Sequence, residues 1–254
     1  MLILRRRTEQ VSGKGEGEGG YLASASDLMI GLLFVFIILV VVLALEQRRK
    51  EDEVEKIKGA ADPRASVTAE IGKALQGSGI KVSVDETSGV ISLPSDALFE
   101  LGESALSTSA QGAILGARAR LAEVLTCYVH SQRARSGATE CASNPGGHEI
   151  DTIFLEGHTD SRPMMRDGMD NVTLSFKRAR AIHQLLLGSE SPLQSYRNAA
   201  GQTVFSYSAY GDTRLLAGIP GEDARNRRVD MRIVLKYQSI NETLRNVDQA
   251  TRGK

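Results

Sequence analysis

The run of apolar residues from Leu28 to Leu45 constrains the fold of this chain more than any other feature. Its 18 residues carry no charge. As an α-helix rising 1.5 Å per residue they would extend about 27 Å, which nearly matches the hydrocarbon core of a bilayer. Residues 21–26 can lengthen the span. The sequence therefore predicts a single transmembrane helix over residues 21–45.

Asp27 stands at the entrance of this apolar run. A carboxylate in a bilayer costs roughly 2.5 to 3.5 kcal/mol at the centre of a helix and less toward its end, so it needs a partner or a proton. We interpret Asp27 as a candidate ion-carrying residue for H⁺ or Na⁺. Two other interpretations stay open. Ser26 and Asp27 are good helix caps, and Arg5–Arg7 could begin a signal peptide, although the apolar run exceeds the 7 to 15 residues typical of one.

The segments on either side of the span differ in size and composition. Residues 1–20 end in a Gly-rich, charged stretch with nothing to bury, which predicts a flexible cytoplasmic tail. Residues 46–79 begin with strong helix formers and opposite charges four apart, which predicts a helical linker or plug. Basic residues flank both ends of the span, so charge does not fix its orientation. Because large domains translocate largely regardless of charge, we expect a cytoplasmic N-terminus and a periplasmic C-terminal domain.

Overall charge and motifs exclude several function classes. The chain has 31 basic and 31 acidic residues and no long basic tract, so we expect no nucleic-acid partner. It contains neither a Gly-x-Ser-x-Gly nor a His-Glu-x-x-His motif, and we expect neither an enzyme nor a bound cofactor. We interpret His158 as a structural residue rather than a catalytic one.

Residues 80–236 carry the pattern of a mixed α/β domain, and residues 237–254 read as a polar C-terminal tail. Apolar alternation and short apolar runs predict strands near 82–84, 90–93, 152–156, 204–210 and 229–235, and helical periodicity predicts helices near 63–76, 110–128 and 172–187. This order predicts an α+β fold, with a β-α-β-α-β core, one additional β-hairpin and helices packed on one sheet.

Cys127 and Cys141 are the only two cysteines. In an oxidising compartment they can form a disulfide that closes a loop of about 15 residues, worth roughly 3 kcal/mol on the chain-entropy model. A zinc site that adds His130 and His148 stays open as the alternative, although the spacing is not that of a standard zinc finger. We expect the disulfide and no metal.

Three motifs lie in a fixed order along this domain: Gly157-His158-Thr159-Asp160, then Asn171-x-x-Leu174-Ser175-x-x-Arg178-Ala179, then Asn226-Arg227-Arg228-Val229, with Tyr210-Gly211-Asp212 before the last. Together they resemble the signature of OmpA-like peptidoglycan-binding domains over roughly residues 80–236. The resemblance implies an OmpA-like fold and a peptidoglycan ligand. The loop between the first two motifs is longer than in outer-membrane members and resembles that of flagellar stator B subunits of the MotB kind.

The resemblance implies which residues hold the peptide stem of the wall. In the family the acid of the first motif and the arginine of the second bind the stem, which corresponds to Asp160 and Arg178 here. The neighbouring family positions correspond to Asn171, Leu174, Asn226 and Arg227. Gram-negative stems carry meso-diaminopimelate, whose side-chain end has an ammonium and a carboxylate, so one acid and one fork-shaped cation suit it. From the residues alone, Asp160 and Arg178 paired with each other, Asn171 as a helix cap and Leu174 as core remain alternatives.

The whole arrangement of tail, membrane helix with an acid, linker and wall-binding domain is similar to that of stator B subunits. Within that group, the stretch Ser26-Asp27-Leu28-Met29 looks more like the B subunit of Zorya anti-phage systems (ZorB). The resemblance implies a homodimer inside a ring of a multi-span MotA/ZorA-like subunit in the bacterial inner membrane, driven by ion flow through Asp27. A flagellar-type stator subunit and a passive membrane-to-wall tether without ion transport are the alternatives.

Overall fold

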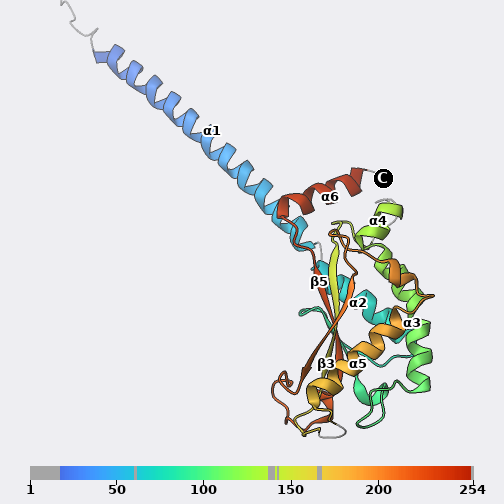
Figure 1. The fold of residues 1–254 in the computed structure, drawn as a ribbon. Coiled ribbons are helices and arrows are strands. Elements are labelled where there is room, and N and C mark those ends of the chain that lie inside the picture. Colours follow the sequence, from blue (N-terminus) through green and yellow to red (C-terminus); the bar gives the residue numbers. More distant parts are fainter. Residues whose placement is uncertain (1–17, 60–61, 137–140, 142, 165–167, 253–254) are drawn as a thin grey trace, which may run out of the picture. The chain divides into compact units, whose positions relative to one another are not determined.

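The computed structural model describes residues 18–59, 62–136, 141, 143–164 and 168–252, with side chains left undescribed at 18–27, 50–59, 136, 247 and 250–252 (Figure 1). The chain divides into two compact units, Met1–Lys56 and Ile57–Lys254. The predicted tail lies outside the described residues up to position 17. The predicted fold class is confirmed: one apolar N-terminal helix precedes a mixed α/β domain with a five-stranded sheet.

Helix α1 extends without a break from Glu18 to Gly59. By length and composition its segment Leu28–Arg49 can cross a membrane. The large apolar side chains of the run are 46–72% exposed, so the chain itself does not cover them. Apolar surface of this extent requires lipid or another subunit as its environment. The first part of the predicted linker, as far as Gly59, is a continuation of this helix.

Helix α2 (Pro63–Gln76) begins where the sequence predicts. Asp62 is its N-cap and accepts a hydrogen bond from the Arg64 amide, and Pro63 fills the first helical position, where no amide donor is needed. The helix falls within residues 46–79, the segment predicted to be a helical linker or plug, and it packs into the second unit. Val67, Ile71 and Leu75 recur with helical spacing and are buried in the core of the second unit, so α2 belongs to the domain.

The sheet has the strand order β1-β2-β5-β3-β4. Its strands are β1 (Ser83–Asp85), β2 (Val90–Pro94), β3 (Ile150–His158), β4 (Phe205–Gly211) and β5 (Arg228–Leu235). Strands β3 and β4 are parallel, and the other pairs are antiparallel. The last strand of the chain therefore lies at the centre, between the hairpin and β3. The predicted hairpin and all three later strands are confirmed to within two residues at each end.

Helices α2, α3 (Thr108–Thr126) and α5 (Asn171–Leu186) pack on one face of the sheet (Figure 1). Alternate strand residues such as Leu155 and Met231 face them and are buried with helix residues such as Ile114 and Ile182. Shorter elements join these parts: η1 (Ser95–Ala97), α4 (His130–Ser136), η3 (Pro192–Ser195) and η4 (Ala224–Asn226). Beyond the sheet, the predicted polar tail includes helix α6 (Ile240–Arg252).

Candidate functional site

Asp160 lies just beyond the carboxyl end of β3, where the backbone is fixed on both sides. The Thr159 amide donates to Gly211 O at 2.8 Å and the Ser161 amide to Gly221 O at 3.0 Å. The buried carboxylate accepts hydrogen bonds from two arginines. Arg162 Nε and Nη2 lie 3.0 and 2.5 Å from Oδ2, and Arg227 Nη1 lies 2.8 Å from the same oxygen. Burial alone would raise the pKa of Asp160, but the bonds from Arg162 and Arg227 together hold it below its usual value.

Arg227 bridges two acids at this site. Besides Asp160 it contacts Asp96 of η1, with Nε 3.2 Å from Oδ1 and Nη2 2.8 Å from Oδ2. The preceding residue, Asn226, is fully buried and organises the loop before β5. Its amide group donates to Pro220 O and Gly221 O at 3.0 Å each and accepts from the Leu216 amide at 2.8 Å. Asn226 therefore shapes the loop, whereas Arg227 presents its charge to the site.

Arg178 is only 3% exposed and lies in the second turn of α5. Its Nε donates to Glu103 O at 2.9 Å, and its guanidinium lies 5.2 Å from the centre of the Phe99 ring. Its Nη1 is buried without a hydrogen-bond partner among the described residues. Burial lowers the pKa of Arg178, and the nearby Asp96 and Asp160 carboxylates offset part of this effect. The site thus contains a buried cation with an unused donor.

Close packing of α5 against β3 fixes the position of this helix, and with it the position of Arg178. A Cβ at Gly157 would stand 2.1 Å from Ser175 O, so only glycine allows this approach. Ser175 in turn accepts a hydrogen bond from the Gly211 amide at 3.0 Å, which ties α5 to the end of β4. Gly211 has φ of +55°, a left-handed conformation that glycine adopts at little cost. The first motif and the Tyr210-Gly211-Asp212 turn therefore both contact the second motif at Ser175.

The start of α5 differs in one respect from the sequence interpretation. Asp170 is the N-cap and accepts from the Thr173 amide at 2.7 Å, so Asn171 is not the cap. Asn171 is the first helical residue, and its Nδ2 donates to Arg162 O at 3.1 Å and to Asp160 O at 3.4 Å. It holds the loop that carries the acid. Leu174 is buried.

The described structure brings Asp160, Asn171 and Arg227 into direct contact, and it places Arg178 beside them. It does not pair Asp160 with Arg178 in a hydrogen bond, the alternative left open above; the acid binds Arg162 and Arg227 instead. Sequence reasoning missed Arg162 and Asp96. A charged residue two positions after Asp160 was a usable signal for Arg162, but Asp96 is 131 residues from Arg227 and left no such signal.

A second set of charged side chains, most of them buried, lies on the sheet face opposite the helices. Glu156 and His158 flank Gly157, whose missing side chain faces α5, so both point to the other face. Arg232 Nε lies 2.9 Å from Glu156 Oε2, and Arg228 Nε lies 2.9 Å from Asp230 Oδ2. These ion pairs do not include the Asp160 carboxylate. The first joins β5 to β3, and the second lies within β5.

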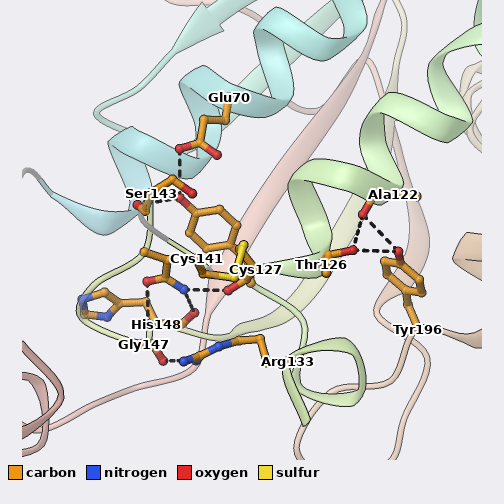
Figure 2. The surroundings of a disulfide bond; sticks show 12 residues. Glu70, Ala122, Thr126, Cys127, Arg133, Cys141, Ser143, Gly147, His148 and Tyr196 are labelled. Atoms are coloured by element: carbon orange, nitrogen blue, oxygen red, sulfur yellow. Dashed lines mark hydrogen bonds between the residues drawn. A yellow bond between two sulfur atoms is a disulfide. The ribbon is translucent and has the colours of Figure 1, made fainter. Parts of the chain in front are cut away.

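Cys127 and Cys141 form a disulfide (Figure 2). With both sulfurs bonded to each other, they are not available as zinc ligands. Beside the bond, Asn144 Nδ2 donates to Cys127 O and His148 O at 2.8 Å each. The hydroxyl of Tyr128 donates to Glu70 Oε1 of α2 at 3.1 Å. The disulfide loop is thereby attached to both α3 and α2.

The Asp27 side chain lies outside the described residues, but its backbone does not. Asp27 lies nine residues after Glu18, inside α1. A helix cap stands at a helix end, so this position does not suit the alternative in which Asp27 caps the helix. The residue lies immediately before Leu28, where the candidate span begins.

Comparisons with known proteins give structural similarities only. No protein-family model matches the chain, and no curated protein matches it. A MotB-like protein from Desulfovibrio vulgaris is 21% identical, with a TM-score of 0.44, over 73% of this chain and 99% of that one. The cell wall anchor of the T6SS from Pseudomonas aeruginosa is 17% identical, with a TM-score of 0.42, over 67% and 97%. A periplasmic domain of Helicobacter pylori MotB is 18% identical, with a TM-score of 0.37, over 63% and 82%.

Proposed function

We propose that this chain is a single-pass inner-membrane protein whose C-terminal domain binds the peptide stem of peptidoglycan. The observation that carries the proposal is the Arg178 guanidinium, which is buried beside Asp160 and has no partner for Nη1 among the described residues. A buried donor left unpaired costs about 1 to 3 kcal/mol. A ligand carboxylate at that position would remove this cost, so the site is suited to an anionic group.

The chemistry of meso-diaminopimelate matches the two charges. Its side-chain end carries a carboxylate for Arg178 and an ammonium for Asp160, and the guanidinium can hold a carboxylate through two parallel hydrogen bonds. Asn171 fixes the Asp160 loop, and Arg227 keeps the acid ionised. Exclusion of water strengthens such contacts because the local dielectric is low.

The binding role can be tested by sedimentation with isolated Gram-negative sacculi. The full chain in detergent micelles should sediment with them, and Arg178→Ala should weaken binding at least about tenfold, since a charge-assisted hydrogen bond contributes roughly 1.5 to 3 kcal/mol. Arg180→Ala is the matched control, because Arg180 is exposed on the same helix. Arg178→Lys keeps the charge without the fork and should also bind more weakly. If a folded Arg178→Ala variant bound sacculi as strongly as the wild type does, the proposal would be refuted.

The disulfide supports a periplasmic position for this domain, because disulfides persist in oxidising compartments and are rare in the bacterial cytosol. With one span before the domain, the N-terminus then lies in the cytoplasm. The apolar surface of α1, exposed from Leu28 to Leu45, is consistent with insertion in lipid.

We further propose that the chain is an ion-driven motor subunit. Support comes from the position of Asp27 inside α1 and from its resemblance to the acid of stator B subunits. Two copies would stand inside a ring of a multi-span MotA/ZorA-like subunit, and each Asp27 would alternate between charged and ion-bound states. Binding of H⁺ or Na⁺ removes most of the desolvation cost, and this changes which partner surface the residue prefers. A membrane potential supplies about 2.3 kcal/mol per charge per 100 mV. The Ser26-Asp27-Leu28-Met29 stretch favours a Zorya anti-phage role over a flagellar one.

Asp27→Asn tests the motor role, because the amide has nearly the same shape but cannot carry the ion. Co-expressed with its multi-span partner, this variant should lose protection against phage entirely, while membrane insertion and sacculus binding stay at wild-type levels. Asp27→Glu should retain part of the protection. Full protection by Asp27→Asn would leave only the passive tether. Lack of protection by the wild type, with restored swimming in a stator-deficient strain, would favour the flagellar role.

A further inference from the structure

Arg162 binds the Asp160 carboxylate, the group that the proposed function assigns to the ammonium of the ligand. Its Nε and Nη2 both contact Asp160 Oδ2, at 3.0 and 2.5 Å, and its backbone amide lies 3.3 Å from Oδ1. A ligand ammonium would need the same oxygens. With Arg227 Nη1 on Oδ2 as well, the acid has little acceptor capacity left.

The two arginines on Asp160 differ in how firmly they are held. Arg227 is 13% exposed at its side chain and also forms two hydrogen bonds with Asp96. The Arg162 side chain is 53% exposed and contacts no acid other than Asp160 among the described residues. Removing Arg227 from Asp160 would therefore disturb a second ion pair, whereas Arg162 can move into solvent without leaving another charge unpaired.

The backbone of Arg162 is held by its neighbours, whereas its half-exposed side chain is held only by Asp160 among the described residues. Asn171 Nδ2 donates to Arg162 O at 3.1 Å, the Ser161 amide is bound to Gly221 O at 3.0 Å, and Pro163 restricts the conformation of the residue before it. Rotation about the side-chain bonds is thus enough to expose Asp160, with no movement of the loop.

We propose that the Arg162 side chain is a displaceable internal substitute for the ammonium of the ligand, and that it thereby sets the affinity and selectivity of the site. In the free protein it neutralises Asp160. On binding, an ammonium group on the ligand replaces it, and the guanidinium moves into water. A ligand with a carboxylate but no ammonium leaves Arg162 in place and contacts Arg178 alone. This inference rests on the proposed binding of peptidoglycan stems.

Calorimetric titration of the full chain in detergent micelles tests this exchange. The first probe is a soluble muramyl tripeptide ending in meso-diaminopimelate, and the second is the same peptide without the side-chain amine. Arg162→Ala should bind the first probe about three- to tenfold more tightly than the wild type, because it removes a competing, largely exposed ion pair. Its affinity for the second probe should not change. Arg162→Lys should give an intermediate gain, since it keeps the charge but loses the fork.

Arg225→Ala is the matched control. Arg225 also follows its acid by two residues and contacts Asp223 through Nε at 2.9 Å and Nη2 at 2.8 Å, but Asp223 is not part of the site. This variant should bind both probes as the wild type does. Unchanged or weaker binding of the first probe by Arg162→Ala, or an equal gain for both probes, would overturn the exchange. If instead no form binds either the tripeptide or sacculi, the proposed function itself fails.

Discussion

His158 is a buried imidazole for which neither ring nitrogen has a hydrogen-bond partner within the described part of the chain. It stacks on Tyr210, with ring centres 5.3 Å apart, and its Nε2 lies 3.4 Å from Asp230 Oδ2. Burial lowers the pKa of His158 to about 4, with help from Arg228 and against the opposing effect of Asp230. An unfolded chain would bind this proton near pH 6.5. Between these values the unfolded state holds more protons, so stability falls as the pH drops from about 6.5 toward 4.

Replacing His158 by Phe should remove this acid sensitivity. Phe keeps the stacking on Tyr210 and loses no hydrogen bond, so stability near pH 7.5 should change by less than about 1.5 kcal/mol. Below pH 6.5 the variant should lose less stability than the wild type. Urea unfolding followed by circular dichroism suits a chain without Trp and can be run from pH 7.5 to 4.5. His158→Gln, which also cannot titrate there, should flatten the profile similarly. An equal loss of stability below pH 6.5 in all three proteins would contradict the assignment of this acid sensitivity to His158.

At the scale of single residues, the motifs indicated which residues lie together better than which contacts they make. Asp160, Asn171, Arg178 and Arg227 do gather at one place, because the resemblance supplied positions that the chain keeps. Their hydrogen bonds depend on which cation the folded loops place nearest to each acid. Arg162 reaches Asp160 from two residues away, and the motifs do not include this position.

At the scale of elements, the contact between β3 and α5 depends on a missing side chain. A Cβ at Gly157 would stand 2.1 Å from Ser175 O and 2.7 Å from Ser175 C, both backbone atoms that cannot move without shifting the helix. Gly157→Ala should therefore destabilise the domain by about 1 to 3 kcal/mol, the usual cost of overpacking. Because α5 carries Arg178, sacculus binding should weaken as well.

Gly116→Ala provides the opposite case for the same substitution. Gly116 lies in α3, and a Cβ there would meet no atom within 4 Å. Alanine should therefore stabilise α3 by roughly 0.5 to 1 kcal/mol, because glycine is the weaker helix former. Thermal unfolding of both variants checks the pair. Equal effects of the same sign would show that close approach at Gly157 does not limit the packing.

Element boundaries followed from local chemistry, whereas membership of the core did not. Asp62 and Pro63 marked the start of α2 correctly because capping is decided within a few residues. The sequence does not show whether this helix belongs to the core or to the linker, because its partners in α3 and β1 become its neighbours only on folding. Asp170 displaced Asn171 as the cap of α5 for a similar reason: adjacent residues of equal capping strength compete, and the incoming loop decides.

At the scale of the whole molecule, hydropathy predicted the division into an apolar helix and a mixed domain. A membrane span depends on composition over a long window, which sequence alone contains. The central position of β5 in the sheet depends instead on pairings between strands far apart in the chain, such as Leu93 with Val229. Such pairings are chosen by the global packing of alternating residues, so the strands were predictable one by one but their order was not derivable from their patterns.

The attachment of α2 determines how the second unit would respond to tension applied through α1. Any pull transmitted along α1 reaches α2 first, because α2 is the next helix along the chain. Extracting α2 would expose Val67, Ile71 and Leu75 and break the hydrogen bond from Tyr128 to Glu70. The load would therefore fall first on a buried apolar interface and on a loop cross-linked by a disulfide.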